Sequence, residues 1–199
     1  MRARLLLVLL ALLAGLAVVP APAAEAGDTY RFAVITFSKN YRDTHRSTLT
    51  WQAFRRNADG SRTSLVRKQW RAGSGFTRTS TNACVRNDGW LPNGVYHPRL
   101  FSDYGGSVIK GRAIYLGQHR CGNGTMRQEL FIHTEQGAGS RQCPDRRGDQ
   151  LCRWEYPKIN DYRSYGCIKL SPADLRELYA AWARWFPVGS TDRVRVVVR

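Results

Sequence analysis

The chain has 199 residues, which is typical of one globular domain large enough to bury a core without help from a metal. Its 31 Lys and Arg against 15 Asp and Glu give a net charge of +16, which favours polyanionic partners, among them acidic cell-wall polymers. The sequence contains no zinc-finger pattern and no repeated nucleic-acid-binding module, so we expect no nucleic-acid partner.

The N-terminal segment, residues 1–26, predicts a secretory signal peptide. A basic start precedes an apolar run at 5–19, and small residues follow in Ala-x-Ala spacing. A membrane-spanning helix needs roughly 20 apolar residues, which this run does not reach. We therefore expect a cleaved signal and an exported chain, periplasmic or cell-wall associated, that is not an integral membrane protein.

Four segments in the first half predict strands or turns. Residues 30–37 are rich in aromatic and β-branched residues, as strands are, and residues 47–54 resemble them less clearly. The Asn-Ala-Asp-Gly sequence at 57–60 predicts a hairpin turn, since Asp-Gly readily adopts positive φ, and residues 63–70 predict the partner strand.

The second half predicts further strands and one helix. Residues 107–116 and 129–133 resemble buried strands, and the polar stretch 134–163 between His133 and Ser164 predicts a lid-like insertion. Ser171 followed by proline caps a helix that continues to Phe186, with apolar residues at helical spacing. Residues 194–198 predict a closing strand, so the fold class expected is mainly β (α+β) with one main helix.

Five cysteines are present, an odd number. Cysteines of exported proteins usually form disulfides, so at least one thiol is left over and deserves examination as a reactive group. The five are Cys84, Cys121, Cys143, Cys152 and Cys167.

Cys167 has the sequence context of a nucleophile. It follows Ser164, Tyr165 and Gly166, whose main-chain amides together with its own could bind an oxyanion. A nearby imidazolium would favour the reactive thiolate. Spacing alone leaves four histidines as the possible base, with His133 favoured because it ends a predicted strand; they are His45, His97, His119 and His133.

The chain resembles the L,D-transpeptidase catalytic domain (YkuD type). That family has a strand ending in Ile-His, then Ser-His-Gly-Cys followed by aliphatic, polar and aliphatic residues; here Ile-His stands at 132–133 and Ser-Tyr-Gly-Cys-Ile-Lys-Leu at 164–170. The segments 91–96, 172–179 and 189–198 are similar to other conserved pieces of the family, in the same order. The resemblance is clear from about Trp90 to the C-terminus.

Two departures accompany the resemblance. Tyr165 replaces the family's second histidine, and the segment from His133 to Ser164 is roughly twice as long as usual. With Cys167 as the nucleophile, Cys143 and Cys152 are expected to form a disulfide within the insertion and Cys84 to pair with Cys121. Ser164 is expected to help orient His133 or to be an ordinary loop residue.

The resemblance implies a domain at 27–199 that acts on peptidoglycan stem peptides. Cys167 would attack the carbonyl of a diaminopimelate residue, and His133 would protonate the departing D-alanine. Ser164, Tyr165 and Gly166 would position the loop and the oxyanion. Neither a metal nor a cofactor is expected.

Two other functions fit the sequence less well. A cysteine carboxypeptidase or amidase would use the same residues but transfer the acyl group to water. A basic cell-wall-binding protein without catalytic activity would use tryptophans that stand among arginines, at positions 51, 70, 154, 182 and 185.

Overall fold

The computed structural model describes residues 29–187 and 190–199; the predicted signal segment 1–26 lies outside this range, as do Val188 and Gly189. The fold is mainly β with one α-helix in the described part, as the sequence predicts. Within that part, no helix is both long and hydrophobic enough to cross a bilayer.

In chain order the elements are β1 (Tyr30–Ser38), η1 (Thr44–Arg46), β2 (Ser47–Arg56), β3 (Arg62–Ala72), β4 (Gly94–Tyr96), β5 (Arg99–Gly105), β6 (Lys110–Arg120), β7 (Met126–His133), η2 (Ala138–Ser140), β8 (Ile168–Lys169), α1 (Pro172–Trp185) and β9 (Val194–Val198).

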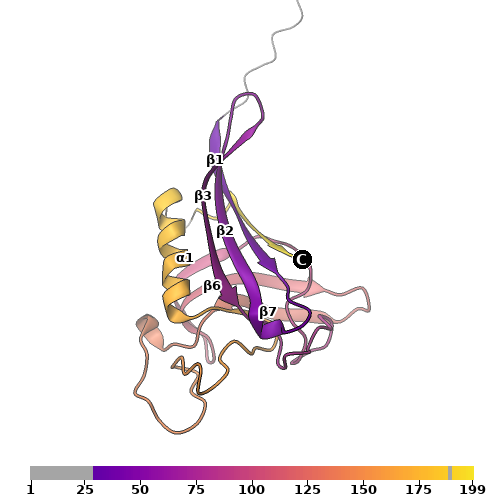
Figure 1. The fold of residues 1–199 in the computed structure, drawn as a ribbon, viewed down its shortest axis with the longest axis vertical. Coiled ribbons are helices and arrows are strands. Elements are labelled where there is room, and N and C mark those ends of the chain that lie inside the picture. Colours follow the sequence, from indigo (N-terminus) through magenta and orange to yellow (C-terminus); the bar gives the residue numbers. More distant parts are fainter. Residues whose placement is uncertain (1–28, 188–189) are drawn as a thin grey trace, which may run out of the picture.

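Two sheets form the molecule. The first has the strand order β3-β2-β1-β9-β4 and the second β5-β6-β7-β8. In Figure 1 the strands of the second sheet run across those of the first, and α1 lies alongside. The β2–β3 hairpin reaches one end of the molecule, whereas the irregular segment 134–163 lies at the other end (Figure 1).

The first sheet follows from alternating hydrophobic residues. In β1, the side chains of Ala33, Ile35 and Phe37 are buried while those between them are partly exposed. β9 shows the same alternation and pairs with β1 in parallel. One face of this sheet therefore packs into the core and the other faces solvent.

Helix α1 covers the buried face of the first sheet. Its start is stabilised by Ser171, whose hydroxyl accepts a hydrogen bond from the Asp174 amide at 3.1 Å. Trp182 is fully buried and packs against Trp51, with 5.6 Å between ring centroids. These two tryptophans therefore belong to the core. They are not available to contact a cell-wall polymer at the surface.

The second sheet differs most from the sequence prediction. The strand expected at 107–116 occupies Lys110–Arg120 instead, because a turn brings β5 back to pair with β6. β5 was not predicted, since its sequence lacks alternation and its side chains are mostly exposed or half-buried. The two-residue strand β8 pairs in parallel with the end of β7.

A loop beyond β3 is joined to β8 at Gly73. The Gly73 amide donates to the Lys169 carbonyl at 3.0 Å, and the Lys169 amide donates to the Gly73 carbonyl at 2.8 Å. A Cβ at Gly73 would lie 2.2 Å from the Tyr162 carbonyl oxygen, so only glycine fits this position. The contact brings the insertion, the post-β3 loop and β8 together around one site.

Candidate functional site

Cys167 and His133 are brought together by the parallel pairing of β7 with β8. His133 pairs with Lys169 and Ile132 with Ile168, so Cys167, just before β8, lies beside Phe131. Residues two apart on a strand face the same side, which places the Cys167 and His133 side chains on one face of the sheet. Both line the same pocket.

The imidazole of His133 is held in a defined tautomer. Its Nδ1 lies 3.1 Å from the Thr134 carbonyl oxygen, which can only accept, so Nδ1 carries the proton and Nε2 is free to accept one. Burial, and then the positive charge of Lys169, lower the pKa of His133 to about 3. His133 is therefore neutral at physiological pH.

Cys167 is the free cysteine of the described residues, and its thiol is partly exposed. Sγ lies 3.4 Å from the carbonyl oxygen of Glu129, which has a positive φ of 52° where β7 departs from regular pairing. Burial raises the pKa of Cys167 to about 11. Both shifts favour the uncharged forms, a neutral thiol and a neutral imidazole, whereas the sequence suggests a thiolate stabilised by an imidazolium.

The serine and glycine before Cys167 shape the loop. The Ser164 hydroxyl donates to the Cys167 carbonyl at 2.6 Å and accepts from the Gly166 amide at 3.2 Å. Ser164 therefore stabilises the loop, and the carbonyl of Thr134 takes the orienting role that the sequence suggested for Ser164. Because the Gly166 amide is engaged, the amides of Tyr165 and Cys167 remain as the donors to consider for an oxyanion.

Arg127 is a site residue that sequence reasoning missed. Its guanidinium is almost fully buried and donates to the carbonyls of Gly89 at 3.0 Å, Tyr165 at 2.9 Å, Trp90 at 3.4 Å and Ala83. A Cβ at Gly166, whose φ is 119°, would lie 2.1 Å from Arg127 Nη2. Arg127 thus connects the loop before Cys167 to the segment 83–90.

Tyr165 forms part of an aromatic wall at the pocket. It is 61% exposed and stacks on Phe76, with 5.1 Å between centroids and 8° between planes. Arg163 lies over the other ring of this pair, 5.7 Å from the Phe76 centroid. Val108, Ile109 and Leu151 add apolar lining, so the pocket presents apolar and aromatic surface beside the thiol.

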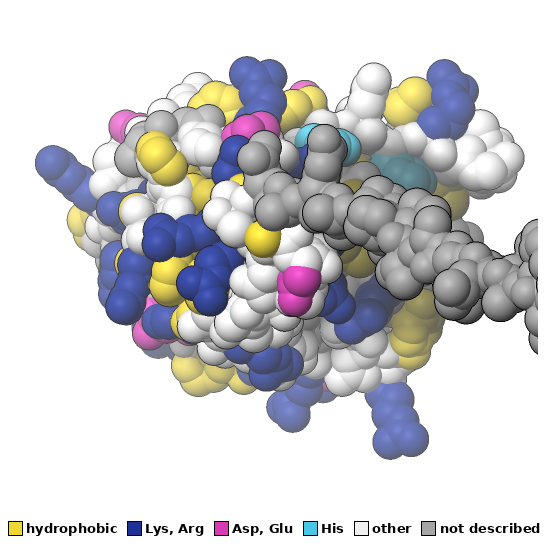
Figure 2. Space-filling view, turned by 90° about the horizontal axis from the view of Figure 1, so that it is seen from above, with side chains coloured by type: hydrophobic (Ala, Val, Ile, Leu, Met, Phe, Trp, Pro, Cys, Tyr) yellow, Lys and Arg dark blue, Asp and Glu magenta, His cyan; other side chains and the backbone are white. Residues whose placement is uncertain are grey.

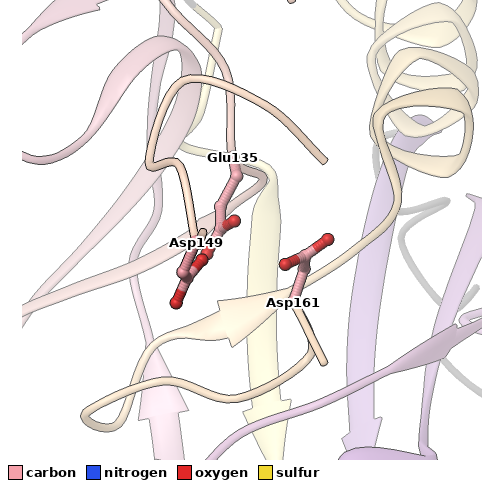
Figure 3. A group of neighbouring side chains, drawn as sticks. All are labelled: Glu135, Asp149 and Asp161. Carbon is pink, nitrogen blue, oxygen red and sulfur yellow. The ribbon is translucent and has the colours of Figure 1, made fainter. Parts of the chain in front are cut away.

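Three carboxylates meet at the base of the insertion, as Figure 3 shows. One oxygen from each of Glu135, Asp149 and Asp161 lies within 4.8 Å of the others, an arrangement that could hold a cation. However, the Lys169 ammonium forms an ion pair with Glu135, and Arg163 forms one with Asp149. Two of the three carboxylates therefore have a cationic partner within the protein itself.

The remaining cysteines form the disulfides expected from the sequence. Cys143 is bonded to Cys152, nine residues away, and Cys84 to Cys121, 37 residues away. The first bond closes a loop within the insertion that lines the pocket. The second joins the segment contacted by Arg127 to the end of β6.

The other histidines have surroundings unlike that of His133. His45 is buried, with Nε2 3.1 Å from the Gly75 carbonyl oxygen and Nδ1 2.7 Å from the Asn160 side-chain nitrogen, so it joins two loops. His119 lies beside Tyr96, 6.0 Å between ring centroids, and His97 is exposed. None of these three lines the Cys167 pocket.

The chain was compared with family models, curated proteins and solved structures. No protein-family model matches the sequence, and no curated protein is significantly similar to it. Among solved structures, Bd1075 of Bdellovibrio bacteriovorus aligns with a TM-score of 0.44 and 14% identity, over 84% of this chain and 47% of that one. This chain thus spans about half the length of that protein.

Proposed function

We propose that the chain is an exported cysteine acyltransferase of the L,D-transpeptidase type that acts on peptidoglycan stem peptides. The observation that carries the proposal is the pocket shared by the free thiol of Cys167 and the unprotonated Nε2 of His133. The His-before-Cys order and the motif at 164–170 support this family over papain-like cysteine enzymes, in which the cysteine precedes the histidine. Two disulfides suit an oxidising, extracytoplasmic location.

The neutral resting pair implies a particular order of proton transfers. As Sγ of Cys167 attacks the diaminopimelate carbonyl at the L,D bond, its proton passes to Nε2 of His133. The amides of Tyr165 and Cys167 donate to the resulting oxyanion. The imidazolium then gives its proton to the nitrogen of the departing D-alanine, and a thioester remains on Cys167.

The second half-reaction reverses these roles. Nε2 of His133 accepts a proton from the attacking amine of a neighbouring stem, the C–S bond breaks, and the thiol is restored. Because burial and the charge of Lys169 disfavour the imidazolium, the ring should hold the extra proton only briefly in each half-reaction. Water as the acceptor would make the enzyme a carboxypeptidase with the same residues.

The pocket walls suggest how a stem peptide is held. Tyr165 and Phe76 offer an aromatic face at the position where the family has a second histidine. The insertion contributes Leu151 and Asp149 on another side. Substrate binding here should depend more on apolar and aromatic contact than on a second imidazole.

Turnover of purified tetrapeptide muropeptides by the wild type and by Cys167→Ala, His133→Ala and His119→Ala variants tests the proposal. We expect the first two variants to lose turnover with little change in thermal stability, and His119→Ala, outside the pocket, to retain it. New cross-linked dimers in the products would identify transfer, and free tripeptide alone would identify hydrolysis. Full activity of Cys167→Ala would refute the proposal.

A further inference from the structure

A group of arginines lies at the end of the molecule where β1 begins, far from the Cys167 pocket. β1 and β2 place Arg31 directly opposite Arg55, and β2 and β3 place Arg56 opposite Arg62. Figure 2 looks onto this end, where basic side chains are widespread and acidic ones few. We call the group the arginine surface; it consists of Arg31, Arg55, Arg56, Arg62, Arg184, Arg193 and Arg195.

These arginines form no ion pair within residues 29–187 and 190–199, although the charge of Arg56, after hydrogen bonds from Ser61, contributes to lowering the pKa of Asp59. Every ion pair found in that part of the chain involves other basic residues. The nearby carboxylate of Asp192 accepts a hydrogen bond from the Ser190 hydroxyl at 3.1 Å instead. Like charges directly opposite on paired strands repel one another and lower the stability of the fold. A bound anionic ligand would reduce this repulsion.

Aromatic rings hold several of these guanidinium groups in place. Arg31 lies 5.4 Å from the centroid of a Trp185 ring, and Arg193 lies 5.1 Å from that of Tyr30. Arg62 lies over Phe54 at 5.3 Å. Such stacking orders the side chains before a ligand binds, and it also covers ring faces on which nucleic-acid bases would otherwise stack.

Two adjoining hollows give the surface a linear form. One is lined by Arg31, Arg55 and Trp185, and the other by Arg56, Arg195 and Phe32. Tyr30, Asp192 and Arg193 line both of them. A flexible chain could therefore pass from one hollow to the other and meet guanidinium groups in both, with Asp192 as the one acidic residue in the two linings.

We propose that the arginine surface binds a linear phosphodiester polymer that carries no bases. The guanidinium fork matches the oxygens of a phosphate, and the covered ring faces disfavour a ligand that depends on base stacking. The surface and the insertion beside the Cys167 pocket lie at opposite ends of the molecule (Figure 1), so a bound polymer leaves that pocket open. Polymer binding at the arginine surface would not depend on the proposed enzyme activity.

Binding of a synthetic poly(glycerol phosphate) at about 0.15 M salt tests the proposal. The variant Arg55→Gln, Arg56→Gln, Arg193→Gln should bind at least about tenfold more weakly than wild type and show a shallower dependence on salt. The matched control is Arg42→Gln, Arg147→Gln, Arg176→Gln, which removes the same charge from exposed sites elsewhere. We expect it to lose less than about threefold.

Three results would overturn the proposal. Equal losses in the two triple variants would show that net charge alone determines binding. Absence of wild-type binding at this salt concentration would show that the surface does not hold the polymer. Tighter binding of a single-stranded oligonucleotide with the same number of phosphates would show that bases contribute, which points to nucleic acid instead.

Discussion

Burial favours the uncharged forms of both Cys167 and His133, and this predicts how the thiol should react as pH changes. Burial raises the pKa of Cys167 to about 11, so the thiolate fraction grows about tenfold per pH unit below that value. Alkylation by iodoacetamide should therefore accelerate steadily between about pH 7 and pH 10. Rates measured by mass spectrometry at a series of pH values check this.

The His133→Ala variant provides the control for this pH profile. Because the imidazole is neutral over the range, its removal takes away no positive charge and should leave the slope unchanged. Suppose instead that the wild-type rate reaches a plateau below pH 7 and that the His133→Ala variant shows no plateau. That result would contradict a neutral pair and support the thiolate–imidazolium pair expected from the sequence.

Arg127 allows a second prediction at this scale. Its positive charge lowers the pKa of Cys167, and its hydrogen bonds hold the Tyr165 carbonyl beside the nucleophile. Arg127→Ala should raise the thiol pKa, slow alkylation at fixed pH, and cost about 1–3 kcal/mol of unfolding free energy through unsatisfied carbonyls.

The Arg127→Lys variant distinguishes the effect of the positive charge from the effect of the guanidinium's hydrogen bonds. A lysine keeps the positive charge but cannot reproduce the four-acceptor pattern, so alkylation should recover toward wild type while kcat stays low. An Arg127→Ala variant with wild-type alkylation rate and wild-type kcat would show that Arg127 only supports the fold.

The site shows what the sequence could and could not predict about single residues. Odd cysteine number and the motif around Cys167 predicted the free thiol and both disulfides, which the structure contains. Arg127 was not predicted, because its burial depends on carbonyls that a distant loop supplies. Thr134 orients His133 through a main-chain oxygen, which no side-chain pattern reveals.

Among the elements, regular patterns were predicted well and irregular pairing was not. Aromatic and β-branched composition and the Asp-Gly turn predicted β1, β2 and β3, and residues 194–198 predicted β9. The Ser171 cap predicted α1 to within about two residues at each end. β5 could not be predicted, because its side chains are largely exposed and its register against β6 is irregular, so its sequence carries no regular hydrophobic pattern. The composition of 134–163 predicted an irregular segment, but its path depends on contacts such as that between His45 and Asn160.

The insertion should control substrate binding more than chemistry. Cys143→Ser, Cys152→Ser removes a bond that closes a short loop, worth about 2–3 kcal/mol in the chain-entropy model. Since Asp149 and Leu151 in this loop line the pocket, KM for a tetrapeptide muropeptide should rise several-fold while kcat changes little. A fall in kcat at constant KM would show that the insertion acts on the reacting groups.

At the scale of the whole molecule, the two crossed sheets separate two surfaces. The edge where β7 meets β8 carries the thiol and the imidazole, and the opposite end of the first sheet carries the arginine surface. If both proposals hold, this arrangement would allow the protein to hold a polymer at one end while a stem peptide enters the pocket at the other. The net charge could be predicted from the sequence but this division could not, because the arginines come from β1–β3 and from residues 184–195, which are far apart in the chain.

The most direct test of the account is the intact mass of the protein after incubation with a tetrapeptide muropeptide. We predict a covalent adduct equal to the donor less its terminal D-alanine, located on Cys167 by peptide mapping and absent from Cys167→Ala. A wild-type mass that stays unchanged while the protein remains folded, or an adduct on another residue, would contradict it.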